Sequence, residues 1–293
     1  MTVPFSVLLP VYRGDRAERF RAAFASTALQ QTLPPDEVII VRDGPVGPEL
    51  AAALDEVRAT ASPRVVVVEL ARNVGLAAAL SAGLAACGND VVARMDADDE
   101  SLPNRFERQI AELERRGLDL LGGGMFEVAG EDSHVVGRRI PPVGHDEITR
   151  VSSLRSPFNH PTIVFRKAAV EAVGGYVEAG RMEDYWLFAR LLHSGAAVDN
   201  LAEPVLRYRV DEGAYERRGG IEQFRTELGL QRMLRAEGYL TTPQFVRNVV
   251  VRGTYRLLPP GMRRPLYRRW AVTPSSGEVA TPSSGDVPGR DVG

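Results

Sequence analysis

Four acidic residues lie within five positions of one another: Asp96, Asp98, Asp99 and Glu100. They follow directly on an apolar stretch of small and β-branched residues, 91–95, that is typical of a buried strand. Carboxylates at this density repel one another unless a cation offsets their charge, and oxygen ligands suit a hard divalent metal. Because side chains alternate along an extended chain, Asp96 and Asp98 point to the same side. The spacing therefore indicates a metal site at the end of a strand.

The same acids have a second, local interpretation. Pro103 is favoured in the first turn of a helix and predicts one that begins near Ser101. Acids ahead of a helix stabilise its dipole without binding any metal. These residues alone leave both interpretations open.

Three further places carry residues with useful chemistry. Asp43 precedes Gly44 at the end of a short apolar run, where turn formation alone would explain it. Glu183 and Asp184 fall in the first turn of an amphipathic helix over 182–193, where they favour the helix dipole and remain ionised, as a general base requires. His160 precedes a proline, which biases its backbone toward an extended conformation and fixes the direction of the ring. It is either a structural residue or a substrate contact.

The elements that position these residues alternate along the first half of the chain. Apolar runs at 5–11, 37–41, 65–69 and 91–95 predict buried strands, and helical patterns lie between them. This alternation predicts an α/β fold with a mostly parallel sheet covered on both faces and right-handed crossovers. Ligands bind such sheets at the carboxyl ends of the strands, which brings Tyr12, Asp43 and the acids after residue 95 to one edge. The sequence after the first strand contains no G-x-G-x-x-G, which disfavours a dinucleotide site of that kind.

The second half predicts a mixed continuation of the sheet and a helical end. Strands are expected at 118–128, 135–140, 162–165 and 205–210, and a helix at 145–154. Helices follow over 221–237 and 242–257, with a short one reaching residue 270. We therefore expect a catalytic domain over 1–220, a basic helical extension over 221–270 and a disordered tail over 271–293, where Thr-Pro-Ser-Ser-Gly repeats.

Charge and composition limit the partners. The net charge of −2 gives no general attraction for nucleic acid. Residues 247–270, however, hold seven arginines and no acid, interleaved with aliphatic and aromatic residues, and this predicts peripheral contact with an anionic membrane. The alternative is a solvated basic helix, or one packed on the domain. The single cysteine allows no internal disulfide, and we find no targeting segment or run long enough to span a bilayer. We expect a cytoplasmic protein at the inner face of the cell membrane.

Eight stretches in order resemble one family. They are SVLLPVY (6–12), QQTLPPDEVIIVRDGP (30–45), NVGLAAALSAGL (73–84), ARMDADDESLPNRFERQ (93–109), PFNHPTIVFRK (157–167), GGY (174–176), MEDYWLFARLL (182–192) and YERRGG (215–220). Together they resemble the family 2 inverting glycosyltransferases with the GT-A fold. The likeness is greatest to bacterial capsular and exopolysaccharide glycosyltransferases of the amylovoran-biosynthesis type.

The resemblance implies transfer of a hexosyl group, with inversion, from a nucleotide-diphosphate sugar to a lipid-linked or oligosaccharide acceptor in cell-surface polysaccharide biosynthesis. A UDP-sugar is the expected donor and Mg²⁺ or Mn²⁺ the expected cofactor. The metal would be held by Asp98 with Asp96, the base would be Asp184 with Glu183 as the alternative, and His160 would contact the acceptor. The residues expected to bind the donor are Pro10, Tyr12, Asp43, Asn73, Arg94, Asp96, Arg217 and Arg218. Asp43 would contact the base or ribose, Asp96 the ribose, and the two late arginines the diphosphate.

Two departures from the family pattern affect the details. Many relatives read Asp-Asp-Gly-Ser where this chain has Arg42, Asp43, Gly44 and Pro45, which leaves the nucleotide open. No histidine follows His193, so the late histidine metal ligand of some relatives has no counterpart in this sequence.

Two other functions fit parts of the pattern. A sugar-1-phosphate nucleotidyltransferase also has a parallel nucleotide-binding sheet, but it should carry a Gly-rich basic loop after the first strand, and PVYRGD is not one. A non-catalytic sugar-nucleotide-binding partner of a membrane assembly would need no base such as Asp184.

Overall fold

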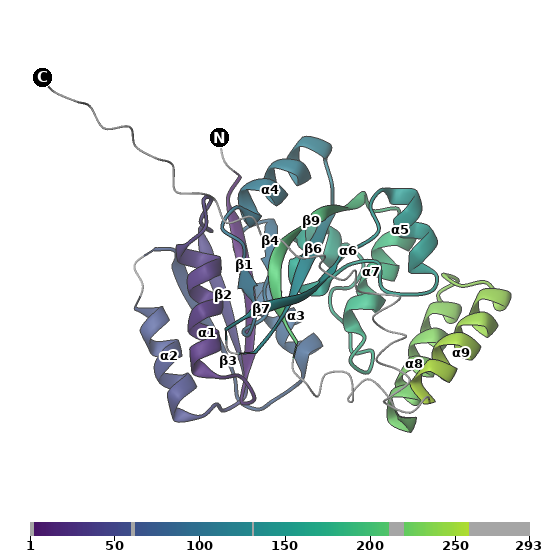
Figure 1. Ribbon diagram of the computed structural model, residues 1–293, viewed down its shortest axis with the longest axis horizontal. Helices are drawn as coiled ribbons and strands as arrows, with labels where there is room; N and C mark the ends of the chain where they lie inside the picture. The colour runs from purple at the N-terminus through teal and green to yellow at the C-terminus, as the bar shows by residue number, and fades with distance from the viewer. Residues whose placement is uncertain (1–2, 60–61, 131, 211–219, 258–293) are drawn as a thin grey trace, which may run out of the picture.

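Four parallel strands form the first half of the sheet in the computed structural model, which describes residues 3–59, 62–130, 132–210 and 220–257. They lie in the order β3-β2-β1-β4, with bounds Phe5–Tyr12 (β1), Glu37–Asp43 (β2), Arg64–Leu70 (β3) and Val91–Arg94 (β4). The helices between them are Ala17–Phe24 (α1, continued by a π-helical turn over Ala25–Leu29), Pro48–Arg58 (α2) and Leu76–Ala86 (α3). The predicted alternation of strands and helices is confirmed (Figure 1).

The sheet then becomes mixed, as expected. β8 (Val164–Arg166) pairs antiparallel with both β4 and β6 (Leu120–Ala129), and β6 also pairs with β7 (His134–Arg139) and β9 (Val198–Arg209). A two-residue strand, β5 (Glu100–Ser101), closes the path against β9. The remaining helices are Arg105–Arg116 (α4), His145–Ser152 (α5), a 3₁₀ turn at His160–Thr162, Lys167–Ala172 (α6), Glu183–His193 (α7), Ile221–Ala236 (α8) and Thr242–Leu257 (α9).

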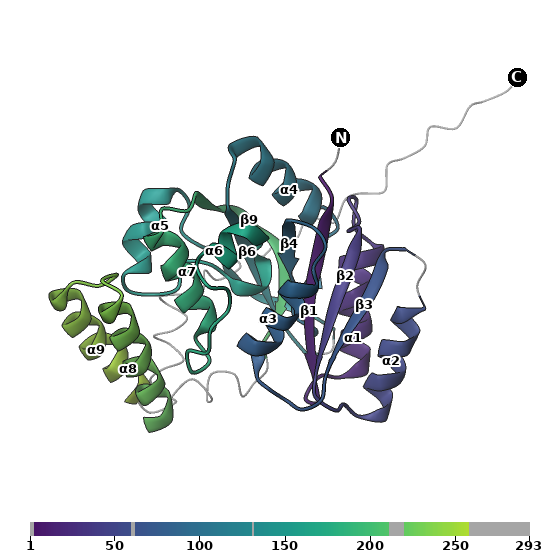
Figure 2. The same cartoon turned by 180° about the vertical axis from the view of Figure 1, so that it is seen from behind.

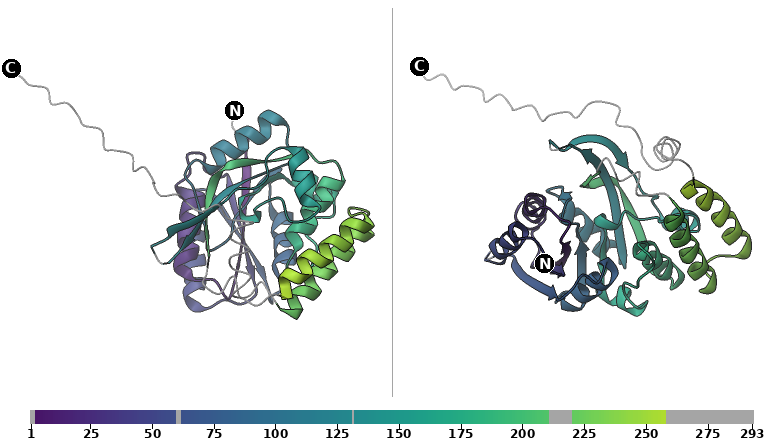
Figure 3. Two further views of the ribbon diagram at one scale, coloured as in Figure 1. Left: turned by 45° about the vertical axis from the view of Figure 1, so that its right-hand side comes forward. Right: turned by 90° about the horizontal axis from the view of Figure 1, so that it is seen from below.

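Alternation along the central strands sends side chains into two cores. Val7 and Leu9 of β1 pack with α1, α2 and α4, whereas Leu8 between them packs with α3 on the opposite face. The second face continues over α5, α6 and α7. Figures 2 and 3 show helices on both sides of the curved sheet. Strands buried on both faces must be almost wholly apolar, and this is why the short runs of the sequence predict them.

A third core joins α7 to α8. Tyr185, Trp186 and Ala189 of α7 pack against Leu230 and Leu234 of α8. At the far end of the molecule from α2, α8 and α9 lie side by side beyond α7 (Figures 1 and 2). Within the described residues, no helix combines the length and hydropathy that crossing a bilayer requires.

Several expected bounds are corrected. Helix α4 begins at Arg105 and not near Ser101, because Glu100 and Ser101 pair with β9. The strand expected at 162–165 begins at Val164 after the 3₁₀ turn, and the strand expected at 205–210 already begins at Val198. The sequence reasoning did not predict α6. The short helix expected to reach residue 270 and the tail expected over 271–293 both lie outside the described residues.

Candidate active site

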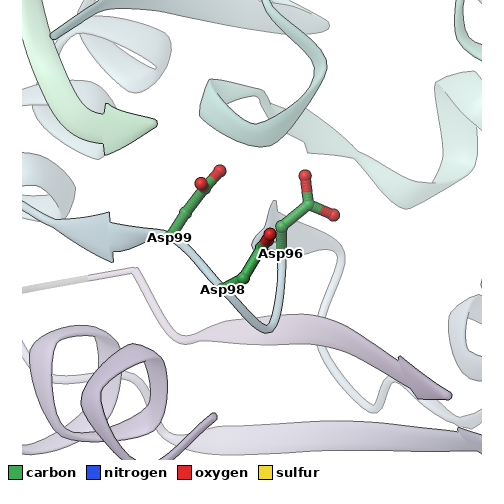
Figure 4. Close-up of side chains that lie close together, drawn as sticks. All are labelled: Asp96, Asp98 and Asp99. Atoms are coloured by element: carbon green, nitrogen blue, oxygen red, sulfur yellow. The ribbon is translucent and has the colours of Figure 1, made fainter. Parts of the chain in front are cut away.

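A turn after β4 gathers three carboxylates. Asp96, Asp98 and Asp99 each offer an oxygen, and these oxygens lie within 4.8 Å of one another. All three side chains extend from the same side of the turn (Figure 4). In a continuous strand, the side chain of Asp99 would point to the face opposite Asp96 and Asp98. The chain turns at Ala97 and Asp98, and this turn places all three side chains on the same side. A set of three hard oxygen donors at this spacing fits a divalent cation such as Mg²⁺ or Mn²⁺.

Asp96 is held by an arginine from the same strand. The guanidinium of Arg94 donates to Asp96 Oδ2 over 2.5 Å, and its second terminal nitrogen pairs with Oδ1. The Arg94 side chain is 2% exposed and the Asp96 side chain 27%, so the guanidinium is shielded from water while the carboxylate is partly accessible. The sequence predicted Arg94 and Asp96 as separate donor contacts, and the structure brings them together as a pair.

Asp99 is the most deeply buried of the three acids. Its Oδ1 accepts the backbone N–H of Arg209 at the end of β9, at 2.9 Å. Burial raises its pKa well above the ordinary value for an aspartate, and the charges of Asp96 and Asp98 raise it further. The repulsion among these acids that the sequence predicted therefore acts on Asp99, whereas its contact with Arg209 was not predicted.

Asp15 is a further acid near this cluster that sequence reasoning missed. Burial raises its pKa to about 7; the hydrogen bond from the Tyr12 backbone N–H opposes this effect, while the charges of Asp98 and Asp96 add to it. The sequence could have indicated this, because Asp15 lies three residues after Tyr12, in the turn that ends β1. At this edge of the sheet the charges of Asp96 and Asp98 thus act on both Asp15 and Asp99.

A buried arginine lies behind the turn. Arg105, at the start of α4, is fully buried and donates to the carbonyl oxygens of Arg94 and Pro161, at 2.7 and 3.0 Å. It also donates to Ser101 Oγ at 3.1 Å. Burial lowers its pKa to about 9, and the positive charge of Arg94 lowers it further. Arg105 ties the strand before the acids to the segment that carries His160.

Asp43 and Asn73 contact each other. Asn73 Nδ2 donates to Asp43 Oδ2 at 2.8 Å, and the backbone N–H groups of Val74 and Gly75 donate to the two carboxylate oxygens at 2.7 and 3.1 Å. In the structure Asp43 therefore fixes the segment that leads into α3. Tyr12, which pairs in register with Asp43 at the same edge of the sheet, is 48% exposed. Pro10 is buried within β1.

Glu183 and Asp184 occupy the first turn of α7, as predicted, but burial outweighs the helix dipole that was expected to keep both acids ionised. Burial raises the pKa of Glu183 to about 7, and the negative charge of Asp184 raises it further. Burial also raises the pKa of Asp184, whereas the backbone N–H of Tyr185 and the charge of Arg94 lower it. Asp184 is partly exposed, whereas Glu183 is 6% exposed. Arg94 thus acts electrostatically on both the acidic cluster and the start of α7.

His160 faces the same region from the 3₁₀ turn. Its Nε2 lies 3.1 Å from the hydroxyl of Tyr176, and the side chain is buried beside Phe188. Burial lowers the pKa of His160 well below its ordinary value, and the charge of Arg94 acts in the same direction, so the ring is neutral at pH 7. Burial raises the pKa of Tyr176; the charge of Arg94 lowers it, and the charges of Asp184, Glu183 and Asp96 add to the rise. Arg217 and Arg218 lie outside the described residues.

Comparison with known proteins identifies the family. The model of "Glycosyl transferase family 2" matches residues 6–174. A UDP-Gal:alpha-D-GlcNAc-diphosphoundecaprenol beta-1,3-galactosyltransferase of Escherichia coli is 34% identical over 275 residues, 92% of this chain and 96% of its own. The amylovoran biosynthesis glycosyltransferase AmsE of Erwinia amylovora is 35% identical over 268 residues, 90% of this chain and 98% of its own.

Solved structures agree on the fold. TarS 1–349 of S. aureus in complex with UDP-GlcNAc has a TM-score of 0.62 at 15% identity, over 92% of this chain and 74% of its own. The mannosyltransferase PcManGT of Pyrobaculum calidifontis, in complex with GDP-Man and Mn²⁺, has a TM-score of 0.61 at 15% identity, over 95% and 77%. The expected fold class and the resemblance drawn from the sequence are both confirmed: the chain belongs to glycosyl transferase family 2, has the GT-A fold, and is similar to bacterial glycosyltransferases of polysaccharide biosynthesis.

Proposed function

We propose that this protein transfers a hexosyl group from a nucleotide-diphosphate sugar, a UDP-sugar, to a lipid-linked or oligosaccharide acceptor, with inversion at the anomeric carbon. The observation that supports this most strongly is the cluster of three carboxylates within 4.8 Å at the carboxyl edge of the parallel strands. Its electrostatic connection through Arg94 to the acids of α7 adds a second reactive group on another element. The E. coli relative uses a UDP-sugar and a diphosphoundecaprenol-linked acceptor, which supports both partners.

The acidic cluster is suited to the diphosphate end of the donor. Asp98, with its neighbours in the turn, would hold Mg²⁺ or Mn²⁺, which when bound offsets the charge that develops on the departing diphosphate. Tyr12, exposed at the end of β1, is accessible to a nucleotide at the same edge. Arg217 and Arg218 remain predicted diphosphate contacts.

The acids of α7 are suited to deprotonating the acceptor. Inversion requires the base and the leaving group on opposite sides of the sugar, and α7 is an element separate from the acidic turn. We assign the base to Asp184 because it is the more exposed of the two acids, and because the backbone N–H of Tyr185 and the charge of Arg94 both lower its pKa and so favour its ionised form. Neutral His160, oriented by Tyr176, is available to hydrogen-bond an acceptor hydroxyl.

We also propose that the protein works at the inner face of the cell membrane. Helix α9 exposes Val246 and Val250, at 53% and 60%, and residues 242–257 contain no acid. This surface is compatible with contact to an anionic bilayer that holds a lipid-linked acceptor.

A screen of nucleotide sugars tests the reaction. Purified protein with Mn²⁺ should release a nucleoside diphosphate from one or a few donors, faster when a lipid-diphosphate-linked saccharide is added. A nucleotidyltransferase would instead release pyrophosphate from a nucleoside triphosphate and a sugar 1-phosphate. A binding partner without catalysis would bind donors and release no product from any of them.

A further inference from the structure

A basic pocket lies between α5 and α9, on elements that do not carry the acidic turn. Its volume is about 570 Å³, which is in the range of small-molecule sites. Arg150 and Arg155 line it from the end of α5 and the residues just after it, and Gln244 and Arg247 line it from α9. The lining holds three arginines and no acid. A hollow lined by charges of one sign attracts the opposite sign, so this pocket favours an anion.

The charge of Arg247 is available to such an anion. Among the described residues, its guanidinium donates to neutral oxygens: Asn248 Oδ1 at 3.1 and 3.0 Å, and the carbonyl and hydroxyl oxygens of Ser153 at 3.4 Å. The residue is exposed. A guanidinium that is held by neutral acceptors keeps its full positive charge, and its planar set of N–H donors matches the oxygens of a phosphate.

The other two arginines extend the positive charge around the pocket. Arg155 is exposed. Arg150 pairs with Glu147 in the same helix through Nε and Nη2, at 2.8 and 2.5 Å, and the two side chains are 72% and 45% exposed. An ion pair this exposed contributes little to stability, so Arg150 can exchange its partner for an anion in the pocket. We therefore expect Arg155 and Arg247 to supply most of the attraction.

The backbone beside the pocket is held by two other helices. Tyr185 of α7 donates its hydroxyl to Ser152 O, and Arg252 of α9 donates to Leu154 O, both at 2.6 Å. These hydrogen bonds fix the chain at 152–154 between α7 and α9. A ligand therefore meets a pocket that is already formed, and binding costs little ordering of the protein.

The surface next to the pocket is apolar. Val246 and Val250 of α9 are 53% and 60% exposed, and Val250 lies one helical turn after both Val246 and Arg247. Residues 242–257 contain no acid. Exposed aliphatic side chains beside a basic pocket suit a ligand that has an apolar part and an anionic head. A free anion would make no contact with these valines.

From these observations we infer that the pocket binds the phosphate of a lipid at the membrane surface, with Arg155 and Arg247 as its main contacts. An anionic phospholipid and the diphosphate of a lipid-linked acceptor share this chemistry. The inference rests on the membrane contact of the proposed function. It assigns that contact to a defined site, which a general attraction to the basic residues over 247–270 would not require.

Flotation of the full chain with vesicles tests the inference in two arms. The first uses phosphatidic acid in phosphatidylcholine, and the second uses a polyprenyl diphosphate in phosphatidylcholine. A third arm measures binding of free pyrophosphate by isothermal titration. Arg155→Gln and Arg247→Gln should each lower vesicle affinity about fivefold in at least one of the first two arms. Arg232→Gln is the matched control, because it removes the same charge from an exposed position on α8 outside the pocket, and it should change affinity less than about twofold.

The arms identify the source of the phosphate. Losses in the first arm indicate a phospholipid headgroup, and losses in the second arm alone indicate the diphosphate of the acceptor. Equal losses for Arg232→Gln and Arg247→Gln would show a general attraction of charges and overturn the inference, as would no loss for either pocket variant. Pyrophosphate that binds through Arg247 when neither kind of vesicle does would also overturn it, because the ligand would then not be a lipid.

Hydrogen exchange of the wild-type protein on the same vesicles answers the question if the variants do not fold. Backbone amides at 149–155 and at 242–248 should become protected together, and protection of α9 without 149–155 refutes the pocket. Release of nucleoside diphosphate from donors is measured separately, without vesicles. Arginine-dependent vesicle binding by a protein that consumes no donor would count against the proposed reaction alone. Donor turnover with vesicle binding that ignores both arginines would count against the inference alone.

Discussion

Glu183→Gln should make the protein more stable above neutral pH. Burial raises the pKa of Glu183 from 4.5 to about 7, with a further contribution from Asp184, so the folded state holds this proton more tightly than the unfolded state. For an acid of this kind the free energy of unfolding falls as pH rises from about 4.5 to about 7, and levels off beyond. The difference between the two pKa values corresponds to about 3 kcal/mol of destabilisation once Glu183 is ionised.

Glutamine has nearly the same shape and never ionises, so it removes this penalty without leaving a cavity. At pH 8 the variant should be more stable than the wild type by up to about 3 kcal/mol, and at pH 4 the two should be nearly equal. Urea unfolding at a series of pH values, followed by tryptophan fluorescence, measures the difference directly, since Trp186 lies in the same helix. Titrating groups that do not interact with Glu183 are common to both proteins and cancel in the comparison.

Glu178→Gln provides the control, because Glu178 is an exposed acid close enough to act on Glu183 electrostatically. A stability difference for Glu183→Gln that is the same at pH 4 and pH 8, or a variant less stable than the wild type at pH 8, would refute the reasoning. It would mean that the carboxylate makes a favourable contact at the start of α7 that outweighs its burial.

Four further outcomes follow from the site. Asp184→Asn should lower kcat for transfer by about 10²- to 10⁴-fold with little change in donor affinity, because a general base contributes that much; if Glu183→Gln loses transfer and Asp184→Asn does not, the base moves by one position. Activity should decline as pH falls, because burial raises the pKa of Asp184 and its protonated form cannot accept the acceptor's proton; a rate that is flat down to pH 4 argues against a carboxylate base. Asp98→Ala should abolish the gain in UDP-sugar affinity that Mn²⁺ produces, which isothermal titration with and without the metal measures. Co-sedimentation with anionic liposomes should decrease as salt rises and on truncation at Arg247, whereas equal binding to neutral vesicles would contradict an electrostatic contact.

The central strands were predictable because burial on both faces leaves only apolar residues in them. The acids at the ends of those strands were predictable for the same reason, since a charged residue directly after such a run must lie at the edge of the sheet. The start of α7 followed from its amphipathic pattern and its two acids. These features are encoded locally, within a few residues of the position they determine.

Contacts between distant segments were not predictable in this way. Asp99 joins the acidic cluster because a turn at Ala97 and Asp98 interrupts the strand, and it is fixed by Arg209, 110 residues away. Asp43 binds the segment at 73–75, and nothing near Asp43 in the sequence indicates this. Arg94 was the available signal for the ion pair, because a charged residue inside a buried strand must find a partner. Only the structure identifies that partner as Asp96.

The third core has a consequence for exchanging parts between related enzymes. Helix α7 carries Glu183 and Asp184 at its start and buries Tyr185 and Trp186 against α8, while Arg252 of α9 pairs with Glu227 of α8 and donates to Leu154 O at 2.6 Å. A chimaera joined at residue 220, with α8 and α9 from a relative of different acceptor preference, would replace the surface on which α7 rests. A shift of that helix by a fraction of an ångström would change where both acids lie relative to the acidic turn. Acceptor preference is therefore better transferred with α7, α8 and α9 as one unit.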